Sequence, residues 1–531
     1  MRLVAWIVAG LIGFGGMVRA EDLLPADRPM DEVVDHYVDA KLEAEKVQPA
    51  AIDDDAALVR RLTLDLNGRV PTEAEARGFV DSTDPEKRVR LVDRLLASPA
   101  YARHQANAFE AMLMAGVKGS LRDYLNTAFR DGRAWDQVFR EILLGDESES
   151  GRKGSSEFLK ARAKDIDKLT NDVSAVFFGV NISCAKCHDH PRVPDWKQDH
   201  YFGMKSFLSR TYASGPFVGE RDTGGVTFKT TKGEERPAKF MFLTGRAIEM
   251  PKVEGAPAEP KPKKQAKDVK TPPPPPKFSA RARLVEIALE PGERDFFARS
   301  IVNRLWSRLF GAGLVMPLDQ MHSANPPSHP ELLQWLARDL VEHGYDLRRL
   351  TRGLVLSKSY SRSSRWESGE VPDPKLFAVA PARPLSPMQL ATSMWLASSD
   401  PRSFPDDLSP EALEQKIADL EGRARGLADS IARPGEDYQI GASESLLLSN
   451  GDRLKDLLSE GNDRLVGRML QAKERRERID LAVRNVLARP PDDEEVAILG
   501  GYLAEREDRP AEACRQLVWS LLTSSEFRFN H

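Results

Sequence analysis

Two cysteines and a histidine lie close together near the middle of the 531-residue chain, in the sequence Asn181-Ile182-Ser183-Cys184-Ala185-Lys186-Cys187-His188-Asp189-His190-Pro191. Cys184, Cys187 and His188 have the C-x-x-C-H spacing. Two thiols three residues apart can reach the two vinyl groups of a haem, and the histidine that follows can ligate its iron. The spacing therefore predicts covalent binding of haem c at these three residues.

Two other interpretations use the same side chains. The two cysteines could close a short disulfide loop, because disulfides are common in exported proteins. Thiolate and imidazole are also the usual ligands of tetrahedral zinc, and the ligands of such a site would be Cys184, Cys187, His188 or His190, and His200. Three nearby aspartates suit either a harder metal or helix caps, and these are Asp189, Asp195 and Asp199.

A haem iron also has a second face that a protein side chain can ligate. We expect a helix that Asp195 caps and that contains Trp196, on which His200 and Met204 lie four residues apart and share one face. The metal-ligand candidates near the cysteines are therefore His188, His190, His200 and Met204. More distant candidates are His104, His322 and His329, and the sequence does not decide among them.

Composition and charge exclude several classes of protein. The chain has 77 Lys and Arg against 81 Asp and Glu, a net charge of −4, which argues against a nucleic-acid-binding protein held by bulk positive charge. Three cysteines are too few for a disulfide-rich scaffold. The third, Cys514, lies in an apolar helical stretch with Leu517, Val518 and Leu521, so we expect a buried thiol there.

The first twenty residues have the pattern of a signal peptide. A charged start is followed by an apolar run and by Val18-Arg19-Ala20, with small residues at the positions that a signal peptidase reads. No later stretch approaches the roughly 18 apolar residues of a transmembrane helix. The pattern predicts an exported protein of the periplasm, cell envelope or extracellular space, with no membrane span in the mature chain.

Most of the remaining sequence has helical periodicity. Helix starts are predicted at the T-x-x-E capping box Thr72–Glu75, at Ser98-Pro99, at a second capping box Ser328–Glu331, and at Asp346. Alternation in Gly225–Phe228 and Phe240–Leu243, with the turn residues Lys232-Gly233-Glu234 between them, predicts a small β-hairpin or sheet. Residues 251–277 are rich in proline and lysine. We therefore predict a mainly α, two-region protein divided into a signal peptide (1–20), a helical domain (21–210), a small β insertion (211–250), a disordered linker (251–277) and a C-terminal helical domain (278–531).

The chain resembles an exported planctomycete family that joins a cytochrome-c-like domain of unknown function to a planctomycete-specific C-terminal domain of unknown function. The segments that carry the resemblance are Leu58–Gly68 with Pro71-Thr72, Leu91–Pro99, Cys184–Pro191, Arg299–Trp306, Phe310–Val315, Ser328–Leu333, Leu356–Tyr360 and Ser525–Phe527. The resemblance implies that Cys184 and Cys187 are thioether sites and that His188 is an axial ligand. It implies neither a second ligand nor a reaction.

Two functions from different classes follow. The first is a haem-c-binding, cytochrome-like protein that transfers electrons to a redox partner in the cell envelope. The second is a non-redox structural protein that associates with an envelope polymer or glycan and whose cysteines and histidines form a disulfide or a zinc site. A hydrolase that uses this cluster with a metal is a third interpretation, and no motif identifies a catalytic residue.

Overall fold

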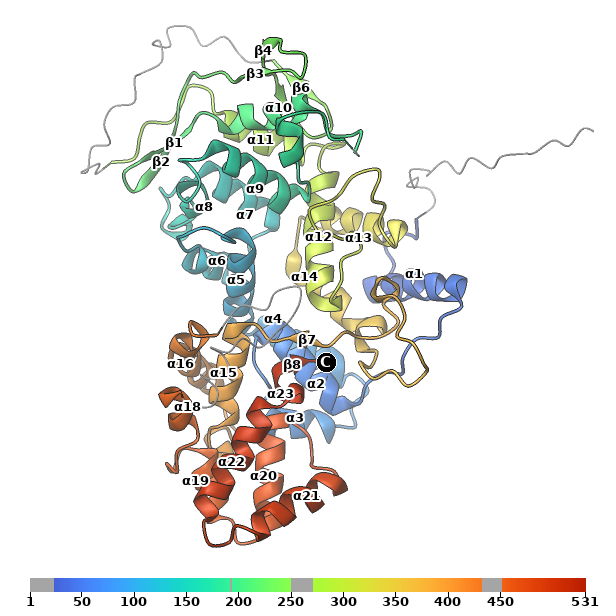
Figure 1. The fold of residues 1–531 in the computed structure, drawn as a ribbon, viewed down its shortest axis with the longest axis vertical. Helices are drawn as coiled ribbons and strands as arrows, with labels where there is room; N and C mark the ends of the chain where they lie inside the picture. Colours follow the sequence, from blue (N-terminus) through green and yellow to red (C-terminus); the bar gives the residue numbers. More distant parts are fainter. Residues whose placement is uncertain (1–22, 192, 250–270, 432–450) are drawn as a thin grey trace, which may run out of the picture.

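The computed structural model describes residues 23–191, 193–249, 271–431 and 451–531. These residues form a mainly α-helical molecule with small two-stranded sheets, which confirms the predicted fold class. Figure 1 shows an elongated chain, with α6–α13 in its upper half and α15–α23 in its lower half. The predicted signal peptide and residues 251–270 of the predicted linker lie outside the described residues.

The N-terminal part of the chain is a succession of helices that ends with the helix following the C-x-x-C-H motif. Its helices are α1 (Met30–Glu45), α2 (Asp55–Asn67), α3 (Glu73–Val80), α4 (Lys87–Ala97), α5 (Pro99–Leu113), α6 (Arg122–Arg130), α7 (Trp135–Leu144), α8 (Glu157–Lys160), α9 (Ile166–Phe178) and α10 (Gln198–Leu208). The Thr72–Glu75 capping box is formed, and the Ser98 side chain accepts a hydrogen bond at the start of α5, where Pro99 is the first residue. Both predicted helix starts are confirmed.

Three small antiparallel hairpins follow α10. They pair β1 (Thr211–Ser214) with β2 (Phe217–Glu220), β3 (Thr227–Lys229) with β4 (Glu235–Pro237), and β5 (Phe240–Met241) with β6 (Ala247–Ile248). The predicted small β insertion is confirmed, and the two segments that indicated it, Gly225–Phe228 and Phe240–Leu243, contribute to different hairpins. The turn at Lys232-Gly233 returns the chain early, so Phe228 faces Arg236, and Phe240 pairs with Ile248 instead.

The C-terminal part is again helical. Its helices are α11 (Ala280–Leu289), α12 (Asp295–Phe310), α13 (Pro330–Glu342), α14 (Leu347–Leu356), α15 (Pro387–Ala397), α16 (Pro410–Ala428), α18 (Asp452–Leu457), α19 (Leu465–Gln471), α20 (Arg475–Leu487), α21 (Asp493–Ala504), α22 (Pro510–Thr523) and α23 (Ser525–Arg528). Asp346 caps α14, as predicted. The predicted Ser328–Glu331 capping box is wrong, because α13 begins with Pro330 and its N-cap is His329, which makes no side-chain capping bond.

Short elements connect these helices. The 3₁₀ turns are η2 (Ser150–Arg152), η3 (Ser183–Lys186), η4 (Ser359–Ser361), η5 (Pro374–Leu376) and η6 (Pro401–Ser403), and a last antiparallel pair joins β7 (Arg383–Pro384) to β8 (Phe529–Asn530). Because β8 pairs with a strand that lies just before α15, it fastens the end of the chain to the middle of the molecule. Figure 1 shows this end beside α2.

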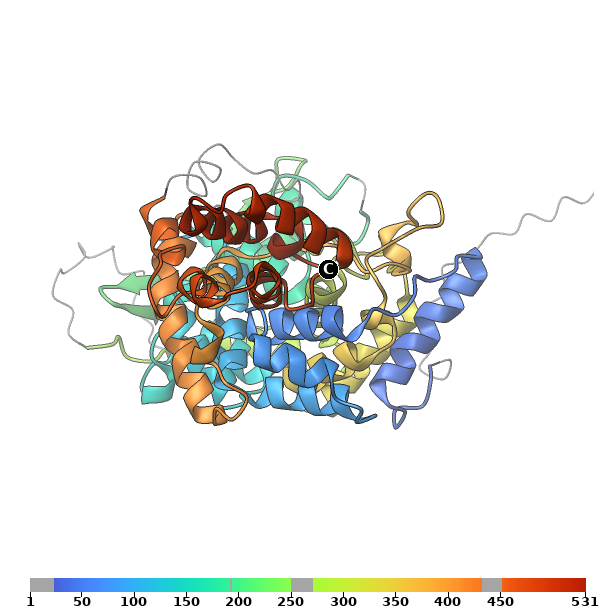
Figure 2. The same cartoon turned by 90° about the horizontal axis from the view of Figure 1, so that it is seen from below.

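The buried apolar side chains form two clusters. One consists of residues between Met30 and Ala378 together with Ala488, and so includes residues on both sides of the predicted linker. The other consists of residues between Leu385 and Phe527 together with Leu64 and Val70 of the N-terminal part. The packing therefore divides near residue 385, and α2 contributes side chains to both clusters. Figure 2 shows α2–α4 lying against the C-terminal helices in the view from below. Cys514 is completely buried in the second cluster, as predicted.

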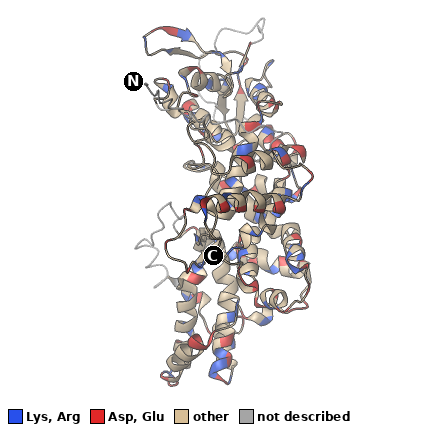
Figure 3. Cartoon of the chain, turned by 90° about the vertical axis from the view of Figure 1, so that its right-hand side faces the viewer, with Lys and Arg blue, Asp and Glu red and all other residues tan. Residues whose placement is uncertain are grey.

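Among the described residues, no helix combines the length and the apolar character that crossing a membrane requires. Basic and acidic residues are interspersed on the side of the molecule shown in Figure 3.

Candidate functional site

The C-x-x-C-H motif lies on the short turn η3 and the residues that follow it, between α9 and α10. Ile182 and Ala185 are completely buried, and they anchor the turn to the larger hydrophobic cluster. Cys184 and Cys187 are both exposed, and each is a free thiol. A turn with its small apolar residue in the core therefore presents both sulfur atoms on the surface, where a prosthetic group can reach them.

An ionic network holds this turn against the start of α9 and against α10. Asp167 accepts a hydrogen bond from Lys186 Nζ at 2.9 Å, from Lys205 Nζ at 2.6 Å and from Tyr201 Oη at 2.7 Å. Burial by itself would raise the pKa of Asp167, but the bonds from Lys205, Lys186 and Tyr201 outweigh burial and hold it well below its ordinary value. Because Lys186 stands between the two cysteines, the network fixes the backbone that carries them.

Gln198, the first residue of α10, binds the other side of the motif. Its side-chain amide donates to the carbonyl of Cys187 at 3.2 Å, and its backbone N–H donates to Asp189 Oδ1 at 2.9 Å. Asp189 thus supplies an acceptor at the start of α10, where helical N–H groups have no partner within the helix. The prediction that Asp195 caps this helix is wrong, since α10 begins three residues later and Trp196 lies outside it.

The hydrogen bond of His188 selects its tautomer. His188 Nδ1 lies 2.7 Å from the carbonyl oxygen of Asp189. A carbonyl can only accept, so Nδ1 carries the proton and the lone pair of the neutral ring is on Nε2. Histidines that bind metals commonly donate their other ring N–H to a carbonyl in this way. His188 is exposed and offers Nε2 as a ligand atom.

The neighbouring histidines have the opposite arrangement. His190 Nδ1 accepts the backbone N–H of Val193 at 3.0 Å, and His200 Nδ1 accepts the N–H of Lys197 at 3.2 Å. In the neutral form of either ring the proton is therefore on Nε2. Ligation through Nε2 would first require this proton to move to Nδ1, which would break the hydrogen bond that Nδ1 accepts from the backbone. Met204 is completely buried in the larger cluster. Hydrogen bonding thus favours His188 over His190 and His200, and burial favours it over Met204.

Two of the more distant histidines lie in other parts of the molecule. His104 packs so tightly on Gly68 that a Cβ there would collide with its ring, and burial together with Arg308 lowers its pKa to about 3. His329 packs against Phe377, and burial together with Lys41 lowers its pKa to about 4. Both rings belong to packed regions outside the motif.

The residues of the motif fit a covalently attached haem. They supply two accessible thiols for thioether bonds and one imidazole with a free Nε2 lone pair, which are the donors that attachment and ligation require. Among the described residues, no group of three or more histidines, cysteines, aspartates or glutamates is placed to hold a metal ion. The zinc site that sequence reasoning offered as an alternative stays a prediction.

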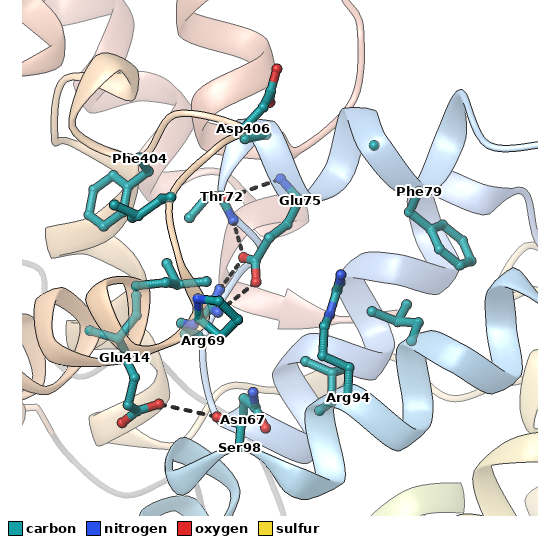
Figure 4. A pocket seen from close by; sticks show the side chains of 18 of the residues that line it. Asn67, Arg69, Thr72, Glu75, Phe79, Arg94, Ser98, Phe404, Asp406 and Glu414 are labelled. Carbon is teal, nitrogen blue, oxygen red and sulfur yellow. Dashed lines mark hydrogen bonds and ion pairs between the residues drawn. The ribbon is translucent and has the colours of Figure 1, made fainter.

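Sequence reasoning did not foresee two large cavities. One of about 1200 Å³ lies between α3, α4 and the segment 404–418, and Figure 4 shows it with Arg94 pointing into it. The other, of about 1790 Å³, includes the half-exposed Trp366 and is lined by residues of the segments 46–57, 363–373, 487–492 and 525–531. Their walls come from segments hundreds of residues apart, so no local pattern marks them.

A buried ion pair forms part of the first cavity. Arg69 donates two hydrogen bonds to Glu75, at 2.7 and 2.9 Å, and Glu75 also accepts the N–H of Thr72 at 2.9 Å. Burial by itself would raise the pKa of Glu75, but Arg69 and the Thr72 N–H outweigh burial and lower it to about 2. The ionised carboxylate therefore stabilises the folded chain.

We expect Glu75→Gln to lower the free energy of unfolding by about 3 kcal/mol at pH 7, because it leaves Arg69 buried without its counter-charge. The folded pKa of Glu75 is below its ordinary value, so the stabilisation is complete above about pH 4.5 and is lost as the pH falls toward 2. Urea unfolding of both chains at pH 7 and pH 3 measures this difference. An equal difference at the two pH values would contradict the prediction.

Two family models match the chain. Residues 33–213 match PSCyt2, a protein of unknown function (DUF1549), and residues 280–433 match PSD1, a protein of unknown function (DUF1553). No curated protein matches the chain, and no solved structure does. The matches confirm one region of unknown function on each side of residues 251–277. The C-x-x-C-H motif lies in the first matched region, and the segment 404–418 that lines the first cavity lies in the second.

Proposed function

We propose that this chain is an exported, cytochrome-like protein that binds haem c covalently through Cys184 and Cys187, with His188 as an axial ligand. The observation that carries the proposal is the 2.7 Å hydrogen bond between His188 Nδ1 and the carbonyl of Asp189. It leaves Nε2 unprotonated on a ring that directly follows two exposed thiols. The name of the matching N-terminal family, PSCyt2, agrees with this assignment.

The chain's own residues have distinct parts in this function. Cys184 and Cys187 would tether the group, while Asp167 holds the Lys186 side chain and Gln198 holds the backbone carbonyl of Cys187. Trp196 is buried beside the motif and limits the access of water, which influences a reduction potential. When bound, haem supplies a one-electron couple, and a redox partner in the cell envelope would exchange that electron.

Export is part of the same proposal. The first twenty residues have the signal-peptide pattern, and exported proteins reach the compartment in which bacteria attach haem to C-x-x-C-H thiols. The proposal therefore places the protein in the periplasm, the cell envelope or the extracellular space.

The test is to produce the chain in a bacterial host with a working periplasmic haem-attachment system and to measure its absorption spectrum and intact mass. A Soret band and a mass gain of one haem that persists after denaturation are expected, because thioether bonds are covalent. Three results would contradict the proposal: an unchanged mass, stoichiometric zinc without haem, or the loss of two protons through a Cys184–Cys187 disulfide. The last two would favour the structural, polymer-associated alternative.

A further inference from the structure

A loop from the second matched region packs against the motif. The backbone N–H of Asn181 donates to the carbonyl of Asp319 at 2.7 Å, and the N–H of Met321 donates to the carbonyl of Gly179 at 3.0 Å. Val180 and Gln320 form an antiparallel bridge between these two bonds. The residues just before the C-x-x-C-H motif are thereby joined to residues 319–321, which lie beyond the linker in the sequence.

The same loop is also fastened to the residues that follow the motif. Asp195 accepts two hydrogen bonds from Ser323, from its N–H at 2.8 Å and from its hydroxyl at 2.6 Å. This is the role of Asp195 that the prediction of a helix cap missed. His322 lies in the sequence between these two attachments, one of which precedes the C-x-x-C-H motif while the other follows it.

The ring nitrogens of His322 have no hydrogen-bond partner among the described residues. The side chain is half-buried, and its Nδ1 is buried. The titratable groups near enough to influence the ring of His322 electrostatically are Asp195 and His190. Burial lowers the pKa of His322, with Asp195 opposing this effect and His190 adding to it.

We propose that His322 is the second axial ligand of the haem attached at Cys184 and Cys187, opposite His188. The inference rests on the proposed function and extends it, because it assigns the ligand that the motif does not supply. His104 and His329 are packed elsewhere, and Nδ1 of His190 and of His200 is engaged by a backbone N–H. His322 is the remaining histidine that the tertiary structure brings to the motif with its ring nitrogens unengaged among the described residues.

This assignment makes the site a joint product of the two matched regions. The first region provides the thioether sites and one ligand, and the second provides the other ligand from the loop between α12 and α13. The contacts of residues 179–181 and 195 with residues 319–323 would then fix the position of the second ligand.

The experiment compares haem-loaded wild-type protein with His322→Ala, His322→Met and His36→Ala, all as full chains. His36 is an exposed histidine on α1 and serves as the matched control. Intact mass reports attachment, and absorption together with electron paramagnetic resonance reports the ligands of the ferric iron. We expect one covalent haem in every variant. The spectra should be low-spin, bis-histidine for the wild type and for His36→Ala, and high-spin for His322→Ala.

The His322→Met variant should have a higher reduction potential than the wild type, since methionine–histidine ligation raises the potential of c-type haem. A His322→Ala protein that carries haem and keeps the wild-type low-spin spectrum would overturn this inference and leave the proposed function standing. A wild-type chain without covalent haem would overturn both. A circular dichroism spectrum equal to that of the wild type shows that each variant is folded.

Discussion

A chain in which Cys184 and Cys187 are both alanine should carry no covalent haem when it is made in a host that loads the wild-type protein. Thioether bonds form at thiols that the attachment machinery can reach, and these two are exposed on one short turn. Each single variant should retain one bond and show a lower yield of haem-loaded chain. The measurement is intact mass under denaturing conditions, with absorption of the Soret band as a second readout.

The third cysteine provides the matched control for this experiment. Cys514 is completely buried, and burial raises the pKa of its thiol, so it takes no part in attachment. Cys514→Ala should therefore keep a full haem complement. Because Cys184 and Cys187 are exposed, their replacement should change the free energy of unfolding of the unloaded chain by less than about 0.5 kcal/mol. A double variant that still gains one haem would contradict the assignment of the thioether sites.

The second large effect is expected at a buried carboxylate that joins distant parts of the chain. Asp65 of α2 accepts hydrogen bonds from Tyr360 Oη at 2.7 Å, Arg383 Nη2 at 2.7 Å and Asn530 Nδ2 at 2.9 Å. The Asp65 side chain is 5 % exposed. The carboxylate raises the pKa of Arg383 despite burial of the guanidinium, which opposes this effect. One residue of the first matched region thus binds the second region and the last strand.

Asp65→Asn should lower the free energy of unfolding by about 3–5 kcal/mol, because it removes the counter-charge of a buried arginine while keeping the shape of the side chain. It should also loosen β8, since Asn530 and Arg383 belong to the paired strands β8 and β7. Urea unfolding at pH 7 measures the first effect. Hydrogen exchange of the backbone amides of residues 525–531 measures the second.

An exposed ion pair gives the control for this substitution. Arg352 donates to Asp93 at 2.6 Å on the surface of the same molecule, where both side chains are more than 40 % exposed. Asp93→Asn makes the same chemical change in water and should cost about 0–1 kcal/mol. Equal losses in the free energy of unfolding for Asp65→Asn and Asp93→Asn would contradict the prediction that burial makes the Asp65 carboxylate strongly stabilising.

Local signals predicted the elements whose interactions span only a few residues. The Thr72–Glu75 capping box, the Asp346 cap and the burial of Cys514 were predicted and found, because each depends on neighbours three or four positions away. The Ser328–Glu331 box was not formed, although its residue types fit. Pro330 starts the helix one residue too late for Ser328 to cap it.

Signals with distant partners were misread. Asp195 resembles a helix cap in the sequence, but its partner is Ser323, 128 positions away. A short polar residue thus satisfied a local pattern while a contact from elsewhere in the chain decided its role.

The sequence by itself determined the mainly helical class of this protein and the cluster of thiols and imidazole at Cys184, Cys187 and His188, since periodicity and spacing are local properties. Tertiary structure alone joined the loop that contains His322 to Asp195, seven residues after His188, and joined Asp65 to Arg383 and Asn530. These partners are 128 or more positions apart, and only the folded chain brings them together. Hydrogen bonds to the ring nitrogens, which no spacing reveals, then separated His188 from His190 and His200.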